Sequence, residues 1–346
     1  KIDRFSESTS RELGDKIEEL QGDSWTGLIL DLRDNPGGLL NQAIEVADFF
    51  LPRGELIVST KGRSEGSAKA YRAPNREKMR VPLVVLINRH SASASEIVAG
   101  ALQDHDRALI VGETSFGKGL VQSIFNLDNE TGMALTTAKY YTPSGRLIQR
   151  DYSGSNVEYL MNTSDAVPET TKDREIRQTD RGRKVYGGGG ITPDFVEPAR
   201  ELSRFEALLA SKDVFFQYAR RLTSGEVPAA SNFQIPARSI EFSAAAGKVP
   251  RTLPNLEITD AILEDFKKYL VERRVEFAEE DIKSNEDFIK RRIRQEVYTS
   301  SFGLQEGFKA AVAGDSQVLK ALDAMPEAKL LMAPGILPPT AQNPVR

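Results

Sequence analysis

The feature that most constrains the fold is a stretch in which two apolar runs enclose a cluster of small residues. Leu83 to Ile87 is a continuous run of leucine and β-branched residues, typical of a strand buried on both faces. Ala108 to Val111 is a second run of this kind. Between them, after Ser95, apolar residues recur at helical spacing: Ile97, Val98, Ala101 and Leu102. The pattern predicts an α/β domain with a mainly parallel sheet, in which residues 91–95 form a strand-to-helix turn.

Such a turn suits nucleophilic catalysis. The free N–H groups at the start of a helix can stabilise a developing oxyanion, and the turn holds three serines. Lys118 lies between Gly117 and Gly119 just after the second apolar run. Apolar surroundings disfavour the charged form of a lysine, and the neutral amine could then deprotonate a serine hydroxyl. The alternative is a lysine whose charged end reaches solvent beside a glycine turn.

Three motifs together resemble the C-terminal processing (tail-specific) proteases, the S41 serine peptidase family. They are Asp31-Leu-Arg-Asp-Asn-Pro-Gly-Gly, Ser91-Ala-Ser-Ala-Ser-Glu-Ile-Val-Ala-Gly and Ser115-Phe-Gly-Lys-Gly-Leu-Val-Gln. The resemblance implies that Ser93 is the nucleophile, that Lys118 is the general base and that Gln122 orients Lys118. No metal or cofactor takes part in such a Ser-Lys mechanism.

The resemblance also implies an oxyanion hole built from two backbone amides. One is the amide of Ala94, directly after the nucleophile. The other belongs to the Gly37-Gly38 pair, and the sequence does not separate Gly37 from Gly38. Without the resemblance, the two glycines would be read as a turn between a strand and a helix.

The resemblance covers residues 1–198 and implies a ClpP/crotonase-like catalytic core. The family usually carries a PDZ domain before the position at which this sequence starts. Residues 199–333 are predicted to form a smaller, mainly helical C-terminal region, with a linker around 223–254 that is rich in Ser, Ala and Pro. Residues 334–346 are predicted to be a disordered Pro-rich tail.

Several shorter elements are also predicted. Residues 2–5 read as a short strand and residues 27–32 as a buried one. Two hairpins are expected, one joining residues 55–60 to 68–72 and the other joining 121–127 to 133–141. The polar segment 151–184 reads as a solvated loop, with a flap over the substrate as the alternative.

Composition limits the possible functions. The chain has 346 residues, 40% of them hydrophobic and 28% charged, which is typical of a globular protein of about two domains. A net charge of −4 gives no electrostatic reason to expect nucleic acid as a partner. The absence of cysteine excludes disulfides, thiolate metal sites and a cysteine nucleophile. No apolar run has the length of a membrane span.

These observations predict a serine endopeptidase that cleaves protein substrates at or near exposed C-terminal tails. By resemblance alone we expect a bacterial periplasm or cell-envelope location, and a homo-oligomer or an activating partner is possible. A different class remains open: a non-catalytic or latent peptide-binding protein on the same fold, which needs a partner or a PDZ module for activity. A histidine base is a minor alternative, since His90 and His105 are the only histidines.

Overall fold

The computed structural model describes residues 1–21, 25–63, 68–74, 79–127, 131–150, 174–231, 233 and 255–333. The chain divides into two compact units. The first unit comprises Lys1–Ala199 together with Ser316–Arg346, and the second comprises Arg200–Asp315. The predicted linker 223–254 lies partly, and the predicted tail 334–346 wholly, outside the described residues.

A four-stranded parallel sheet forms the centre of the first unit. Its strand order is β1 (Leu28–Asp31), β4 (Leu83–Ile87), β5 (Leu109–Gly112) and β10 (Phe195–Val196), and every neighbouring pair is parallel. The prediction of an α/β core with a mainly parallel sheet, followed by a helical region, is confirmed. The two predicted buried-strand runs are β4 and β5, and every residue of both strands is buried.

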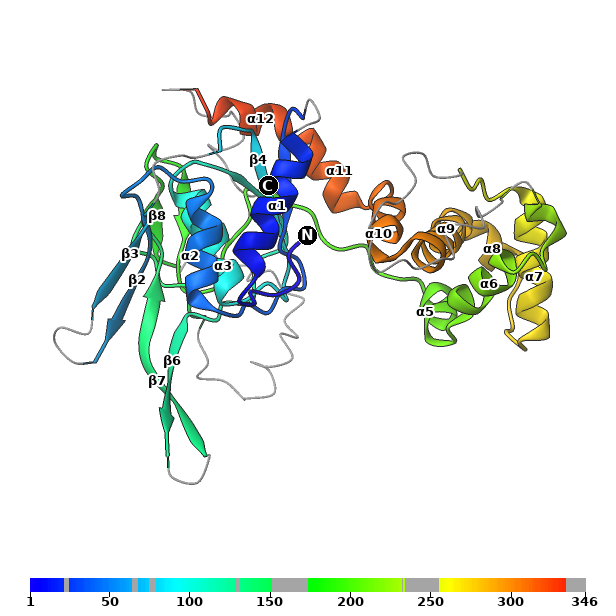
Figure 1. Cartoon of the computed structure of the whole chain (residues 1–346), viewed down its shortest axis with the longest axis horizontal. Helices are drawn as coiled ribbons and strands as arrows, with labels where there is room; N and C mark the ends of the chain where they lie inside the picture. Colours follow the sequence, from blue (N-terminus) through cyan, green and yellow to red (C-terminus); the bar gives the residue numbers. More distant parts are fainter. Residues whose placement is uncertain are drawn as a thin grey trace. The chain divides into compact units, whose positions relative to one another are not determined.

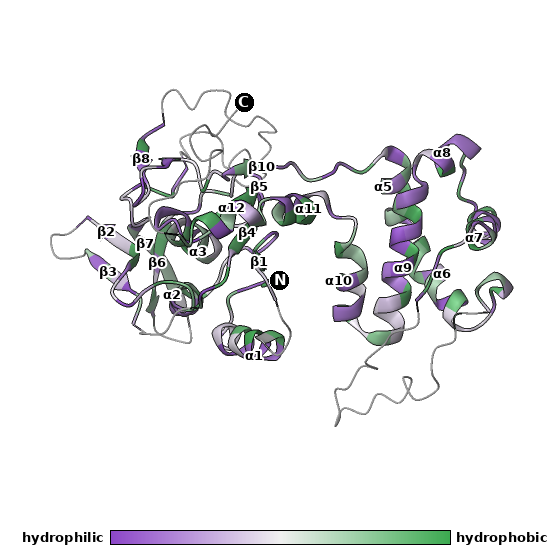
Figure 2. Cartoon of the chain, turned by 90° about the horizontal axis from the view of Figure 1, so that it is seen from above, coloured by the Kyte–Doolittle hydropathy of each residue, from purple (hydrophilic) through white to green (hydrophobic). Residues whose placement is uncertain are grey.

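The two faces of this sheet pack against helices from opposite ends of the first unit's sequence. Leu83, Val85 and Ile87 face one core cluster, which also holds residues of α2 (Leu40–Asp48) and α3 (Ala94–Asp104). Val84 and Leu86 face another cluster. That cluster is completed by α11 (Ser316–Asp323) and α12 (Met325–Leu330), which lie beside β4 in Figure 1 and Figure 2. Helices on both faces explain why β4 carries apolar residues at every position.

The structure places α11 and α12 in the first unit, and this differs from the predicted domain division. The sequence pattern assigned residues 199–333 to one helical region, whereas the structure returns the chain to the first unit at Ser316. The physical reason is the second face of the parallel sheet, which would otherwise expose Val84 and Leu86 to water. Gln317 of α11 also bonds to the Arg33 guanidinium at 2.8 Å, and Arg33 pairs with Asp31.

A second, antiparallel sheet has the order β3, β2, β7, β6. The first predicted hairpin is confirmed as β2 (Leu56–Gly62) and β3 (Lys69–Arg72). The second is confirmed as β6 (Leu120–Asn126) and β7 (Gly132–Tyr141), which together extend well beyond the helices of this unit in Figure 1. Helix α1 (Thr9–Gln21) packs near α2.

Two short predictions differ from the structure. Residues 2–5 do not form a strand; only Phe5 makes an isolated bridge, to Gly38. The segment read as a loop contains β8 (Ile176–Gln178), which pairs with β9 (Lys184–Tyr186). Residues 151–173, which include most of the possible flap, lie outside the described residues.

The second unit is helical in its described part. Its helices are α5 (Arg204–Ser211), α6 (Val214–Thr223), α7 (Asp260–Glu272), α8 (Glu279–Ser284), α9 (Glu286–Phe302) and α10 (Leu304–Val312), with a short 3-10 turn at Pro228–Ala230. Hydrophobic and hydrophilic residues alternate along α9 in Figure 2, as expected for helices that bury one face. The core centres on Tyr218 and Phe266, whose rings meet edge to face at 4.9 Å.

Candidate active site

The turn between β4 and α3 presents Ser93 in an unusual backbone conformation. Ser93 is the residue before the first turn of α3 and has φ 56° and ψ −109°, a positive φ that L-residues with a side chain rarely adopt. Its side chain is half-buried, and no backbone N–H of α3 is bonded to its hydroxyl. A strained turn that leaves a hydroxyl accessible at the end of a buried strand is typical of a nucleophile.

The other two serines of the turn are occupied by structural bonds. Ser91 Oγ donates to Leu32 O at 2.8 Å, and Ser95 Oγ donates to Asn35 O at 3.0 Å. Both serines are completely buried. The hydroxyl groups of Ser91 and Ser95 therefore fasten the turn to the loop after β1, and only Ser93 is left accessible for chemistry.

Glu96 joins this turn to the segment that carries Lys118. One carboxylate oxygen, Oε2, accepts the N–H of Ser93 at 2.7 Å and the N–H of Lys118 at 2.8 Å. The other, Oε1, accepts Ser115 Oγ and the N–H of Gly117, both at 2.6 Å. Glu96 is fully buried, and burial raises its pKa although these four hydrogen bonds oppose the shift.

The sequence analysis did not identify Glu96. A signal was present, because a serine followed three residues later by glutamate at a helix start has the form of a capping box. Half of that motif is formed, since Glu96 accepts the N–H of Ser93. The sequence pattern does not reveal the bonds to Ser115, Gly117 and Lys118, which come from a segment beyond α3 and β5.

Lys118 and Gln122 lie at the start of the β6–β7 hairpin. The Lys118 backbone is fixed on both sides, because Gly117 O accepts the N–H of Arg150 at 3.0 Å and the N–H of Gly119 donates to Gln149 Oε1 at 2.9 Å. The Lys118 side chain is exposed, so the apolar surroundings expected from the sequence are not found: the buried contacts of this loop are made by Ser115, by its backbone and by its glycines.

The three predicted catalytic side chains are not bonded to one another in this structure. Among the described residues, no hydrogen bond joins Ser93 Oγ, Lys118 Nζ and the Gln122 amide. Gln122 is exposed on β6, next to a register shift between Val121 and Gln122. What is held in place is the backbone of Ser93 and Lys118, whose N–H groups share one oxygen and therefore lie within about two hydrogen-bond lengths of each other.

The glycine pair after β1 lies against the serine turn. A Cβ atom added at Gly37 would lie 2.8 Å from Ala92 O, 2.9 Å from Ser93 Cβ and 3.0 Å from the Ala94 nitrogen. Gly37 is buried, and its N–H donates to Asn35 Oδ1 at 2.8 Å. Gly38 is exposed, and within the described part of the chain its N–H and that of Ala94 have no protein acceptor. The structure thus distinguishes the two glycines that the sequence could not separate.

Both histidines are engaged elsewhere. His90 is exposed, and its Nδ1 lies 3.1 Å from Asp34 Oδ1. His105 follows the last turn of α3, at the end of the helix opposite Ser93. Its two ring nitrogens lie 2.7 Å from Asp180 Oδ2 and 2.7 Å from Leu56 O. Neither arrangement joins a histidine to Ser93.

One group of side chains has the atoms required to bind a metal ion. Glu55, His105 and Asp180 each offer a ligand atom, and these atoms lie within 4.8 Å of one another. They come from the loop before β2, the end of α3 and the loop between β8 and β9. The imidazole of His105 is also well placed to act as a cation here: burial lowers its pKa, but the bonds to Asp180 and Leu56 O outweigh that effect and raise it.

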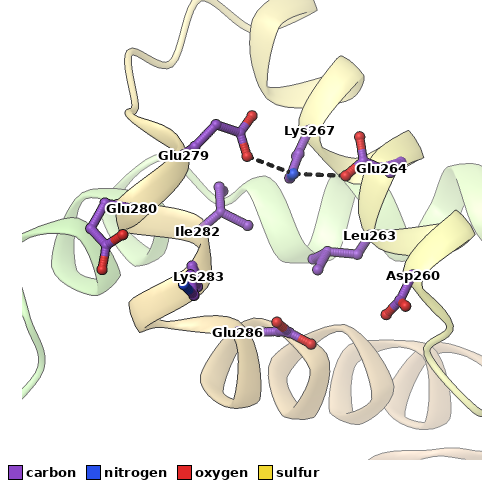
Figure 3. Close-up of a pocket in the computed structure, with 9 residues that line it drawn as sticks. All are labelled: Asp260, Leu263, Glu264, Lys267, Glu279, Glu280, Ile282, Lys283 and Glu286. Carbon is purple, nitrogen blue, oxygen red and sulfur yellow. Dashed lines mark hydrogen bonds and ion pairs between the residues drawn. The ribbon is translucent and has the colours of Figure 1, made fainter.

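A cavity of about 470 Å³ belongs to the second unit. Figure 3 shows that Lys267 lies between Glu264 and Glu279, with Asp260 and Glu286 across the opening. The Lys267 ammonium is 2.7 Å from the Glu264 carboxylate and 2.8 Å from that of Glu279. The lining is therefore an ion-paired helix surface without a nucleophile.

Comparison with known proteins agrees with the motifs of the first unit. Residues 1–158 match the family model of peptidase family S41. The carboxy-terminal-processing protease of Bartonella bacilliformis is 53% identical over 154 residues, which cover 42% of this chain and 35% of that protein. The carboxy-terminal processing protease CtpA of Bacillus subtilis is 36% identical over 184 residues, which cover 53% of this chain and 39% of that protein.

Among solved structures, the photosystem II D1 C-terminal processing protease is similar over 43% of this chain and 38% of its own. The sequence identity is 41% and the TM-score is 0.40. The chain therefore spans less than two fifths of the length of either curated relative. The similarity to peptidase family S41 thus lies in residues 1–158.

Proposed function

We propose that this chain contains the catalytic core of a serine endopeptidase that cleaves protein substrates at or near their C-terminal tails. The observation that carries the proposal is the shared carboxylate oxygen of Glu96, which fixes the backbone of Ser93 and the backbone of Lys118 side by side. Several relatives of the first unit are named as carboxy-terminal processing proteases, which supports the same reaction class.

In this mechanism Ser93 Oγ attacks the peptide carbonyl while Lys118 Nζ takes the hydroxyl proton. Lys118 then gives that proton to the leaving amine, and the substrate remains as an ester on Ser93. Water attacks the ester, Lys118 again takes the proton, and the proton returns to Ser93 as the new C-terminus leaves. Gln122, which is exposed on β6, orients Lys118 during both steps.

The oxyanion hole of this proposal consists of the N–H groups of Ala94 and Gly38. Two observations support Gly38 over Gly37: the N–H of Gly37 is already bonded to Asn35, and Gly37 is buried whereas Gly38 is exposed. Gly37 has a different role, since a Cβ added there would meet Ser93 and the Ala94 nitrogen too closely for a side chain to fit. Donors fixed in advance are usually the largest contribution to such catalysis.

One observation favours a second candidate, a latent or non-catalytic peptide-binding protein. The Lys118 side chain is exposed and is not bonded to Ser93 in the described structure, so catalysis requires a rearrangement of side chains. A substrate, an activating partner, a second copy or a PDZ module could supply the energy for that change.

A periplasmic or cell-envelope location is likewise a proposal. No helix in the described ranges combines the length and the hydropathy needed to cross a membrane.

The test is hydrolysis of casein by this chain and by three variants, Ser93→Ala, Lys118→Ala and Lys69→Ala. Lys69 is an exposed lysine on β3 and serves as the matched control. We expect Ser93→Ala and Lys118→Ala each to lose activity by on the order of a thousandfold or more, and Lys69→Ala to keep it. Turnover that survives Ser93→Ala would exclude the mechanism, and no turnover by the parent would favour the latent protein.

Two further controls address the remaining alternatives. Replacing both histidines with alanine should leave turnover nearly intact, because the ring bonds described for both go to groups other than Ser93; a loss of about a thousandfold would instead identify a histidine base. Treatment with EDTA should leave turnover unchanged, because no step uses a metal ion.

A further inference from the structure

We propose that Glu96 is a positioning residue that sets the distance between the nucleophile and the general base. The inference rests on the proposed function, because it assigns a task to Glu96 within that mechanism. It does not make Glu96 a catalytic residue: the carboxylate contacts the backbone of Ser93 and Lys118 and has no part in proton transfer.

The contacts of Glu96 connect two separate segments, which also share one backbone hydrogen bond, from the N–H of Phe116 to Ser91 O at 2.9 Å. Ser93 directly precedes α3, whereas Ser115, Gly117 and Lys118 lie in the loop between β5 and β6. Glu96 Oε2 accepts one N–H from each of these segments, and Oε1 accepts two donors from the loop. A displacement of either segment by a fraction of an ångström lengthens a bond to the same carboxylate, so the turn and the loop are mechanically coupled.

The charge of Glu96 is the second part of the argument. Its side chain is fully buried, and among the described residues no lysine, arginine or histidine forms an ion pair with it. A buried carboxylate without a cation is costly unless its oxygens are saturated with donors. Here three backbone N–H groups and one hydroxyl supply them, aided by the position of Glu96 in the first turn of α3. Loss of any of these donors is therefore unfavourable, which makes the arrangement rigid.

Glutamine cannot replace this glutamate, for a geometric reason. Each carboxylate oxygen accepts at least one backbone N–H, from Gly117 at Oε1 and from Ser93 and Lys118 at Oε2. Whichever way the side-chain amide of the Glu96→Gln variant is turned, its NH₂ group faces an N–H donor. The substitution keeps the size of the side chain and replaces one acceptor with a donor, so it breaks either the bond to Gly117 or the bonds to Ser93 and Lys118.

Glu206 provides a matched control within the same chain. It is also completely buried, also occupies the third position of its helix, α5, and also accepts the N–H of the residue before the helix, Ser203, at 2.9 Å. Its other oxygen binds Arg200 in the second unit. Glu206→Gln therefore reproduces the loss of a buried helix-capping carboxylate without touching the serine turn or the lysine loop.

The experiment measures kcat and KM for labelled casein, and the rate at which a fluorophosphonate modifies Ser93, in the full chain and its variants. We expect Glu96→Gln to lower kcat and the modification rate by on the order of a hundredfold, with KM changed by less than about threefold, as misplaced reacting groups do. Glu206→Gln should change neither rate by more than about twofold. A purely structural role would lower the thermal stability of both variants and leave kcat per folded molecule unchanged.

Other outcomes would overturn the inference. If Glu96→Gln and Glu206→Gln have the same kcat per folded molecule, Glu96 is a helix cap and no more. If Glu96→Gln does not fold, Ser115→Ala decides, because it removes one donor and leaves the other three bonds to the carboxylate. It should lower kcat by about tenfold with KM unchanged, and a loss below about twofold refutes the inference. If Ser93→Ala retains the parent's turnover, the proposed function itself fails, and the inference fails with it.

Discussion

Gly37→Ala tests whether the close packing of the glycine loop on the serine turn is required for catalysis. Gly37 has φ +100°, outside the narrow left-handed region that other residues tolerate. A Cβ atom here would also approach Ala92 O to 2.8 Å and Ser93 Cβ to 2.9 Å, closer than normal contact. The loop and the turn would have to separate, which would disrupt the proposed oxyanion hole of Ala94 and Gly38.

The magnitude follows from two separate costs. Holding alanine at this φ costs roughly 1–3 kcal/mol, and forcing a methyl group into a filled space costs roughly 1–3 kcal/mol more. Gly54→Ala separates the two, because Gly54 has φ +91° but nothing within 4 Å of an added Cβ. We therefore expect Gly54→Ala to lower the free energy of unfolding by the backbone cost alone and to keep full activity. Gly37→Ala should lower it by the sum of both costs, about 2–6 kcal/mol.

Urea unfolding, monitored by tryptophan fluorescence, measures the difference in stability between the two variants. Trp25 is the only tryptophan and packs against the core of the first unit, so it reports that unit without interference from the second. Turnover per folded molecule should fall by at least about a hundredfold in Gly37→Ala, the scale seen when one oxyanion donor is lost. Equal urea midpoints for Gly37→Ala and Gly54→Ala, or turnover within about threefold of the parent, would refute the reasoning.

Two further predictions concern charges in the first unit. Arg183→Met should destabilise the unit by about 3–5 kcal/mol in urea unfolding, because Arg183 is the buried partner of both Asp106 and Asp194 and its loss leaves two carboxylates unpaired. For His105, the folded-state pKa is raised above its ordinary 6.5, so the ion pair with Asp180 stabilises the fold fully below that value and is lost as pH rises through the folded pKa. The stability lost in His105→Gln should therefore be larger at about pH 5.5 than at about pH 9.

Each of these has a simple check. Arg177 forms an ion pair with Glu175 in which both side chains are about half exposed, so Arg177→Met should cost less than about 1 kcal/mol. A comparable loss for Arg177→Met and Arg183→Met would contradict the assignment of the cost to burial. For His105, an equal loss of stability at both pH values would show that the imidazole does not gain a proton on folding.

Most secondary structure of the first unit could be predicted because the information is local. The run Leu83 to Ile87 is β4 residue for residue, since five consecutive leucine and β-branched residues fit only a fully buried strand in this context. The Gly132–Tyr141 strand was predicted to within a residue from the hairpin turn before it. The short sheet of β8 and β9 was missed because its strands are polar and three residues long, with no period to detect.

The candidate site was predicted in part. Sequence reasoning found the serine cluster, the glycine pair and the lysine because each lies at a recognisable turn, but residue types alone could not rank Ser91, Ser93 and Ser95. Their hydroxyl bonds separate them, since Ser91 and Ser95 donate to the backbone of the loop after β1. Glu96 was missed because its role depends on donors that lie about twenty residues further along the chain.

The sequence by itself determined that β4 and β5 are buried on both faces and that a serine turn and a helix follow β4. It could not determine what covers the second face of the sheet. In the tertiary structure α11 and α12 cover that face. Their apolar residues lie in one cluster with Val84 and Leu86, although more than two hundred residues separate them in the sequence. A hydrophobic pattern shows that a surface must be buried, but which element buries it depends on how the whole chain folds.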